Sequence, residues 1–120
     1  MVLYLKPIAR IAAIFLISSW GVFAHAILVQ STPKPNEVLA GPAFTLALTF
    51  NSRVDQARSS LVLEKADHST SKVTISLDPA SPDKLTGKVS SLTPGPYKLH
   101  WQVLAVDGHI TRGEVPFQVK

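Results

Sequence analysis

The sequence predicts an all-β fold, a seven-stranded Greek-key β-sandwich or barrel preceded by a signal peptide helix. Beyond residue 26, apolar and polar residues alternate with a period of two in short runs, and turn-forming residues separate these runs. No stretch there shows an apolar period of 3.6 residues over the length of a helix. A chain of 120 residues is long enough for one core of this kind, so we expect one domain.

The alternation places the strands and divides their side chains between core and solvent. We expect strands at residues 27–31, 43–51, 59–65, 72–77, 84–90, 97–106 and 114–119. On the sixth of these, Trp101 lies among the apolar positions and is expected to anchor the core, whereas Lys98, His100 and Gln102 point to solvent. The same alternation assigns to the core Phe44, Leu46, Leu48, Phe50, Val115, Phe117 and Val119.

The first 24 residues differ in composition from the rest of the chain. Lys6 and Arg10 are the only charged residues ahead of an apolar run at 11–23, which is the layout of a secretory signal peptide. The run is shorter than the ~20 residues that cross a bilayer as a helix, and no stop-transfer pattern follows it. We expect residues 1–24 to be a signal peptide, rather than an uncleaved anchor, and residues 25–120 to be a soluble periplasmic domain.

Two cleavage points fit the preference of signal peptides for small residues at their last and third-last positions. Cleavage after Ala24 makes His25 the first mature residue, whereas cleavage after Ala26 makes Ile27 the first. The local sequence slightly favours the second point, because alanine stands at both positions. The rest of the chain favours the first, for the reasons below.

The composition restricts the kinds of site that the mature domain can hold. The chain has no cysteine, and its one methionine is Met1, so any metal must be bound by nitrogen and oxygen ligands. Removing Lys6 and Arg10 with the signal peptide lowers the net charge from +4 to +2. The remaining basic residues are scattered without a cluster, which gives no support to nucleic-acid binding.

Four histidines could carry metal chemistry. His68 lies in a polar turn, where a solvated residue is expected. His100 lies on the outward face of a strand without a His or carboxylate two residues away, so neither histidine is a leading ligand candidate. His109 follows Asp107 by two residues, so both side chains can point to one side and bind one ion. Alone, this Asp-Gly-His segment is more typical of a turn in which glycine supplies a positive φ.

His25 strengthens the metal interpretation, because cleavage after Ala24 would give it a free α-amine. The α-amine has a pKa of about 7.7–8 and loses its proton to a metal readily near neutral pH. The imidazole Nδ1 closes a chelate ring with that amine. Amine and imidazole nitrogens together suit tetragonal Cu(II).

Several short segments stand out along the mature chain. They are His-Ala-Ile-Leu at 25–28, Ser-Thr-Pro at 31–33, Pro-Gly-Pro-Tyr at 94–97, Trp101, Val-Asp-Gly-His at 106–109 and Gly113. Together they resemble the CopC family, and the resemblance covers essentially the whole mature chain. The resemblance implies a seven-stranded Greek-key β-barrel or sandwich, of the Ig-like or cupredoxin-like kind. It also implies one Cu(II) ion with three ligands, which here are His25, Asp107 and His109.

The chain departs from the family pattern at three places. Members often begin His-x-His, whereas the third mature residue here is Ile27. Many have an acidic residue just after the second strand, where this chain has Asn51, Ser52 and Arg53, and Asp55 is not assigned in its place. The methionine-rich Cu(I) site of some members is absent, so shuttling of copper between two sites is not expected.

The function expected from these features is Cu(II) capture for copper homeostasis, resistance or delivery, without catalysis. The expected partner is an inner-membrane copper importer of the CopD type. The alternative enzyme is a copper-dependent oxygenase, because an N-terminal histidine with another histidine also resembles a histidine brace. Two features argue against an oxygenase. The few aromatic residues fall at core positions, and Asp107 would occupy a coordination position that oxygen chemistry needs open. A metal-free Ig-like interaction module remains if cleavage falls after Ala26.

Overall fold

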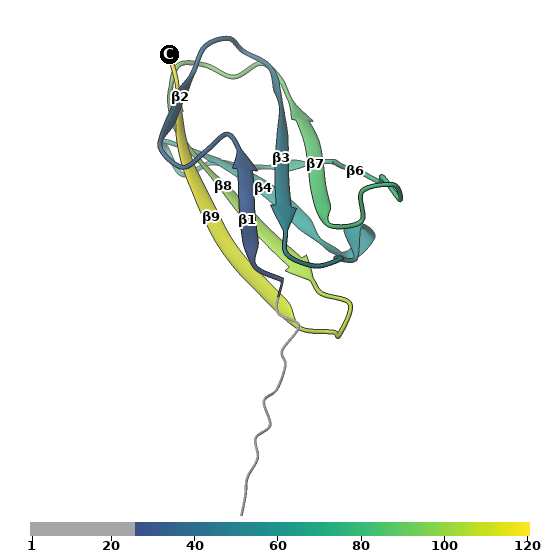
Figure 1. Ribbon diagram of the computed structural model, residues 1–120. Helices are drawn as coiled ribbons and strands as arrows, with labels where there is room; N and C mark the ends of the chain where they lie inside the picture. Colours follow the sequence, from purple (N-terminus) through teal and green to yellow (C-terminus); the bar gives the residue numbers. More distant parts are fainter. Residues whose placement is uncertain (1–25) are drawn as a thin grey trace, which may run out of the picture.

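The computed structural model describes residues 26–120 as two β-sheets packed face to face, which confirms the predicted all-β fold (Figure 1). The predicted signal peptide helix and His25 lie outside the described residues. Within residues 26–120, no helix has the length and hydropathy needed to span a membrane.

The described residues form nine strands and one short 3-10 helix. The four-stranded sheet has the order β1 (Leu28–Thr32), β3 (Phe44–Phe50), β7 (Lys84–Val89) and β6 (Ile75–Ser76). The five-stranded sheet has the order β2 (Glu37–Leu39), β9 (Ile110–Val119), β8 (Gly95–Leu104), β4 (Ser60–Lys65) and β5 (Thr70–Val73). Neighbouring strands are antiparallel, except that β2 runs parallel to β9. The 3-10 helix η1 covers Gln56–Arg58.

The strand predicted at 72–77 is two strands in different sheets. Val73 ends β5, which pairs with β4, whereas Ile75 begins β6, which pairs with β7. The chain crosses between the sheets at Thr74 and runs close to Gly87, where a Cβ atom would stand 2.8 Å from the Thr74 carbonyl oxygen. Alternation alone cannot show such a crossing, because the burial pattern continues through it.

Strand β2 is an addition to the predicted set. The prolines before it indicate a turn, and the chain does turn there, with Asn36 at a φ of 66°. The Glu37 carboxylate accepts a hydrogen bond from the Lys34 backbone N–H at 2.8 Å, which closes the turn. Residues 37–39, which form β2, then pair with the end of β9.

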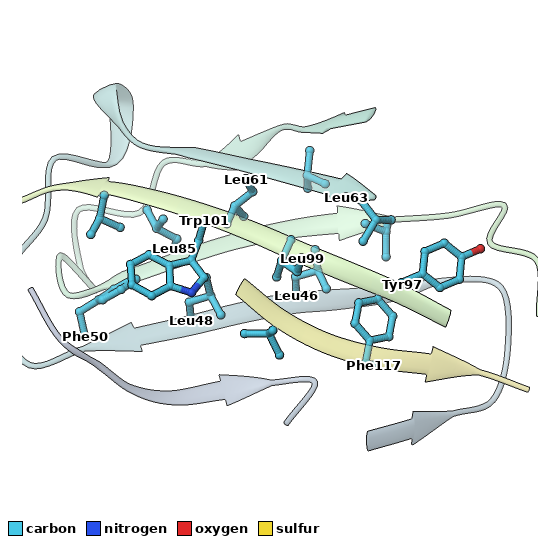
Figure 2. Close-up of a cluster of buried hydrophobic side chains, with 14 of the residues drawn as sticks. Leu46, Leu48, Phe50, Leu61, Leu63, Leu85, Tyr97, Leu99, Trp101 and Phe117 are labelled. Atoms are coloured by element: carbon cyan, nitrogen blue, oxygen red, sulfur yellow. The ribbon is translucent and has the colours of Figure 1, made fainter. Parts of the chain in front are cut away.

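The core lies between the two sheets (Figure 2). It contains the side chains that the alternation assigned to it, except that Phe44 is only partly buried and packs against its edge. Phe50 and Trp101 meet edge to face with ring centroids 5.2 Å apart. At the other end of the core, Tyr97 stacks on Phe117 at 5.5 Å. The Tyr97 hydroxyl donates a hydrogen bond to the Thr93 carbonyl oxygen at 2.8 Å, so its polar group is satisfied at the edge of the core. Burial of each large apolar side chain contributes about 1.5–3 kcal/mol to the free energy of unfolding.

Trp101 packs against the backbone of the neighbouring strand at Gly113. The two residues are paired across β8 and β9, and a Cβ atom at Gly113 would stand only 2.4 Å from the Trp101 Cζ2 atom. The indole is buried, with 8% of its residue surface exposed. Glycine at position 113 therefore provides the space that the indole ring fills.

Gly113→Ala should destabilise the protein by about 1–3 kcal/mol, because the added methyl group overlaps the buried indole ring of Trp101. Denaturant unfolding followed by circular dichroism measures the change. Trp101→Phe is the matched partner, since the smaller ring leaves room for the methyl group. The double variant should lose less stability than the two single variants together. If the stability losses of the two single variants simply add up in the double variant, the indole ring is not what excludes a side chain at position 113.

Candidate metal centre

Asp107 and His109 lie in the turn that joins β8 to β9. The Ala105 N–H donates to the His109 carbonyl oxygen at 2.8 Å, and the Gly108 N–H donates to the Ala105 carbonyl oxygen at 2.9 Å. Gly108 has a φ of 92°, a conformation that residues with a side chain rarely adopt. The segment therefore forms the turn that the sequence predicted, with glycine at the position of positive φ.

The turn brings the two side chains into direct contact. One Asp107 oxygen, Oδ1, accepts a hydrogen bond from the His109 backbone N–H at 3.0 Å. The other, Oδ2, lies 2.8 Å from His109 Nδ1. A neutral imidazole that donates from Nδ1 has its lone pair on Nε2, which is the form that binds a metal ion. The pair therefore combines a carboxylate with an imidazole of fixed orientation.

The start of the described chain is fastened at the same end of the sandwich. The Ile27 N–H donates to the Asn51 Oδ1 atom at 2.8 Å, and the Asn51 N–H donates to the Ile27 carbonyl oxygen at 2.9 Å. Ala26, just before them, is fully buried. The beginning of β1 and the β8–β9 turn lie at one end of the molecule in Figure 1. Asn51 thus holds the chain start through its side chain and its backbone N–H.

Asp55 has a structural role at this end. Its side chain accepts a hydrogen bond from the Arg58 N–H at 3.1 Å and begins the 3-10 helix. Its own N–H donates to the Leu104 carbonyl oxygen at 2.8 Å, and Val54 forms an isolated bridge with Ala105. These contacts join the β3–β4 connection to the base of the β8–β9 turn and hold the turn in place.

The structure brings together two of the three predicted ligands, Asp107 and His109, and His25 lies outside the described residues. Within residues 26–120, no three His, Cys, Asp or Glu side chains converge on a point that could hold a metal ion. At this turn, the described part of the chain thus places one carboxylate and one imidazole side by side.

His68 and His100 lie away from the turn, on the outer face of the five-stranded sheet. The side chain of His68 is 85% exposed, as expected for a turn residue. Both imidazoles contact Glu64, at 2.8 Å for His68 and 2.6 Å for His100. Sequence reasoning missed this carboxylate, because it considered positions along the strand of His100, and Glu64 comes from the neighbouring strand β4.

Comparisons with known proteins agree with this architecture. Copper resistance protein C of Xanthomonas campestris pv. juglandis is 30% identical over 111 residues, which cover 87% of each chain. Among solved structures, CopC from Methylosinus trichosporium OB3b superposes with a TM-score of 0.73 at 28% identity, over 80% of this chain and 94% of that one. PcoC, a methionine-rich copper resistance protein from Escherichia coli, gives 0.66 at 26%, over 81% of this chain and 100% of that one.

The family comparison covers the domain that the structure describes almost from end to end. Residues 28–120 match the CopC domain, from the first residue of β1 to the last residue of the chain. The match includes the β8–β9 turn and both sheets. The chain therefore belongs to the CopC domain family.

Proposed function

We propose that the mature protein begins at His25 and captures one Cu(II) ion in the periplasm through His25, Asp107 and His109. The observation that carries the proposal is the Asp107–His109 pair at the end of the sandwich where the described chain starts. Membership of the CopC domain family supports it. The bound ion serves copper homeostasis or resistance, or delivery to an inner-membrane importer of the CopD type. The proposal requires no catalytic step.

The fixed position of the first described residues favours His25 as a metal ligand. Ala26 is buried and Ile27 is hydrogen-bonded through both its backbone groups, so the chain is fixed one residue after His25. A ligand held close to its partners loses less conformational entropy when the metal binds. The same fixed start makes the amine sensitive to any extension of the chain. If cleavage instead follows Ala26, the site is lost and an Ig-like interaction module remains.

The donor atoms decide the oxidation state in this proposal. An amine, imidazoles and a carboxylate suit Cu(II), whereas Cu(I) prefers thiolate and thioether sulfur. The chain contains no cysteine, and Met1 leaves with the signal peptide. Protonation competes with the metal for the amine and imidazole nitrogens. Reduction or acidification would therefore release the ion to a partner.

The mature protein beginning at His25 should bind Cu(II) at least about tenfold more tightly than a form with one extra residue before His25, because the extension converts the amine into an amide. Isothermal titration in the presence of a competing chelator measures both affinities. The extended form is its own fold control, since its circular dichroism spectrum should be unchanged. Equal affinities would remove the N-terminus from the site.

Asp107→Ala and His109→Ala should each weaken binding of the first Cu(II) equivalent by at least about tenfold, because each removes one ligand. Both positions lie in the turn and outside the core, so the unfolding transition should remain cooperative. His68→Ala and His100→Ala are the matched controls and should leave the first equivalent unchanged. Loss of the Cu(II) d–d band in His100→Ala, with His109→Ala unaffected, would refute this ligand assignment.

A further inference from the structure

Two histidines and two glutamates gather on the outer face of the five-stranded sheet. Glu64 Oε2 lies 2.8 Å from His68 Nδ1, and Glu64 Oε1 lies 2.6 Å from His100 Nε2. On the other side of the His100 ring, Nδ1 lies 3.6 Å from Glu114 Oε2. One carboxylate thus joins two imidazoles, and a second carboxylate faces the far nitrogen of one of them. We call these four residues the His68–His100 cluster.

The cluster is produced by strand register and by one turn. His100 on β8 pairs directly with Glu114 on β9 and with Val62 on β4. Glu64 lies two residues beyond Val62, so its side chain is on the same face of the sheet. The turn after Lys65 brings His68 back over Glu64, with His68 at a φ of 67° and its N–H donating to the Lys65 carbonyl oxygen at 2.9 Å.

The shared carboxylate is held as an anion. Hydrogen bonds from His68 and then from His100 keep the pKa of Glu64 below its usual value. Its side chain is only 18% exposed, whereas the His100 side chain is 40% exposed. Two cations border the cluster, Lys98 directly across from Glu64 in β8 and Lys65 next along β4. At the centre of the cluster, the carboxylates of Glu64 and Glu114 lie against the two nitrogens of the His100 ring.

We propose that the His68–His100 cluster binds one divalent transition-metal ion, with Zn(II) as the representative, through His100, Glu64 and His68. Two histidines and one glutamate are an established zinc donor set. The ion takes the position of the ring protons that now face Glu64, and each ring then keeps one proton on its other nitrogen. Glu114 then orients His100 by accepting a hydrogen bond from its other nitrogen, which is the usual partner of a metal-bound histidine.

The distances show what must move for the ion to enter. Ligand atoms about 2.0–2.2 Å from one tetrahedral ion stand roughly 3.3 Å from each other. The His100–Glu64 contact is 2.6 Å and therefore needs to open by well under one ångström. His68 must swing from the far oxygen of Glu64 toward His100, since no three such groups in residues 26–120 already converge. Its 85% exposed side chain leaves it room to do so.

The inference does not depend on the copper site proposed above, and its test separates the two. The mature protein carrying Asp107→Ala and His109→Ala is titrated with Zn(II), and the ring ¹⁵N shifts of its histidines are followed by NMR. We expect the rings of His68 and His100 to shift together with one binding curve. Shifts at His25 alone, or no saturable shift at His68 and His100, would overturn the proposal.

Substitutions in the same background test the ligand set. Glu64→Gln and His100→Ala should each weaken Zn(II) binding at this cluster by at least about tenfold, and Glu114→Gln should weaken it less. Asp83→Asn removes one carboxylate charge outside the cluster and should have no effect. Amide spectra with native dispersion confirm that each variant is folded. Equal Zn(II) affinity in Glu64→Gln and Asp83→Asn would show that the cluster is not a metal site.

Discussion

The long antiparallel pairing of β8 with β9 is the interaction on which the rest of the structure depends. It runs without a break from Gly95 opposite Val119 to Leu104 opposite Ile110. Its inner face carries Trp101 into the core against Phe50. Its turn presents the Asp-His pair, and its outer face sets His100 beside a carboxylate from each neighbouring strand. One register therefore positions the core anchor, the proposed copper ligands and the proposed second site.

The domain reaches this arrangement without disulfide crosslinks. The sequence has no cysteine, so burial between the sheets and the strand pairing must supply the stability. Such a core requires tight packing at particular positions. Gly113 beneath the indole and Gly87 beside the crossing chain are two of them, and each excludes a larger side chain. The β8–β9 turn, which carries the proposed copper ligands Asp107 and His109, lies outside this core, so substitutions there leave the core packing in place.

The sequence predicted features that depend on local pattern and missed those that depend on register. Alternation placed Trp101 in the core and His100 on the outer face, and the Asp-Gly-His segment indicated a turn. Pattern could not place Glu64 beside His100, because that contact depends on how β4 aligns with β8. It also could not detect the change of sheet at Thr74, where burial continues while the pairing partner changes.

The proposed copper site requires that processing expose His25 as the first residue, next to a chain start that Ile27 and Asn51 hold in place. Cleavage after Ala24, rather than after Ala26, is the condition for this. The most direct measurement is the intact mass of the exported protein, with sequencing of its N-terminal peptide. The account predicts a chain that begins at His25, after removal of residues 1–24. A chain that begins at Ile27 would lack the histidine and its amine, and it would contradict the account.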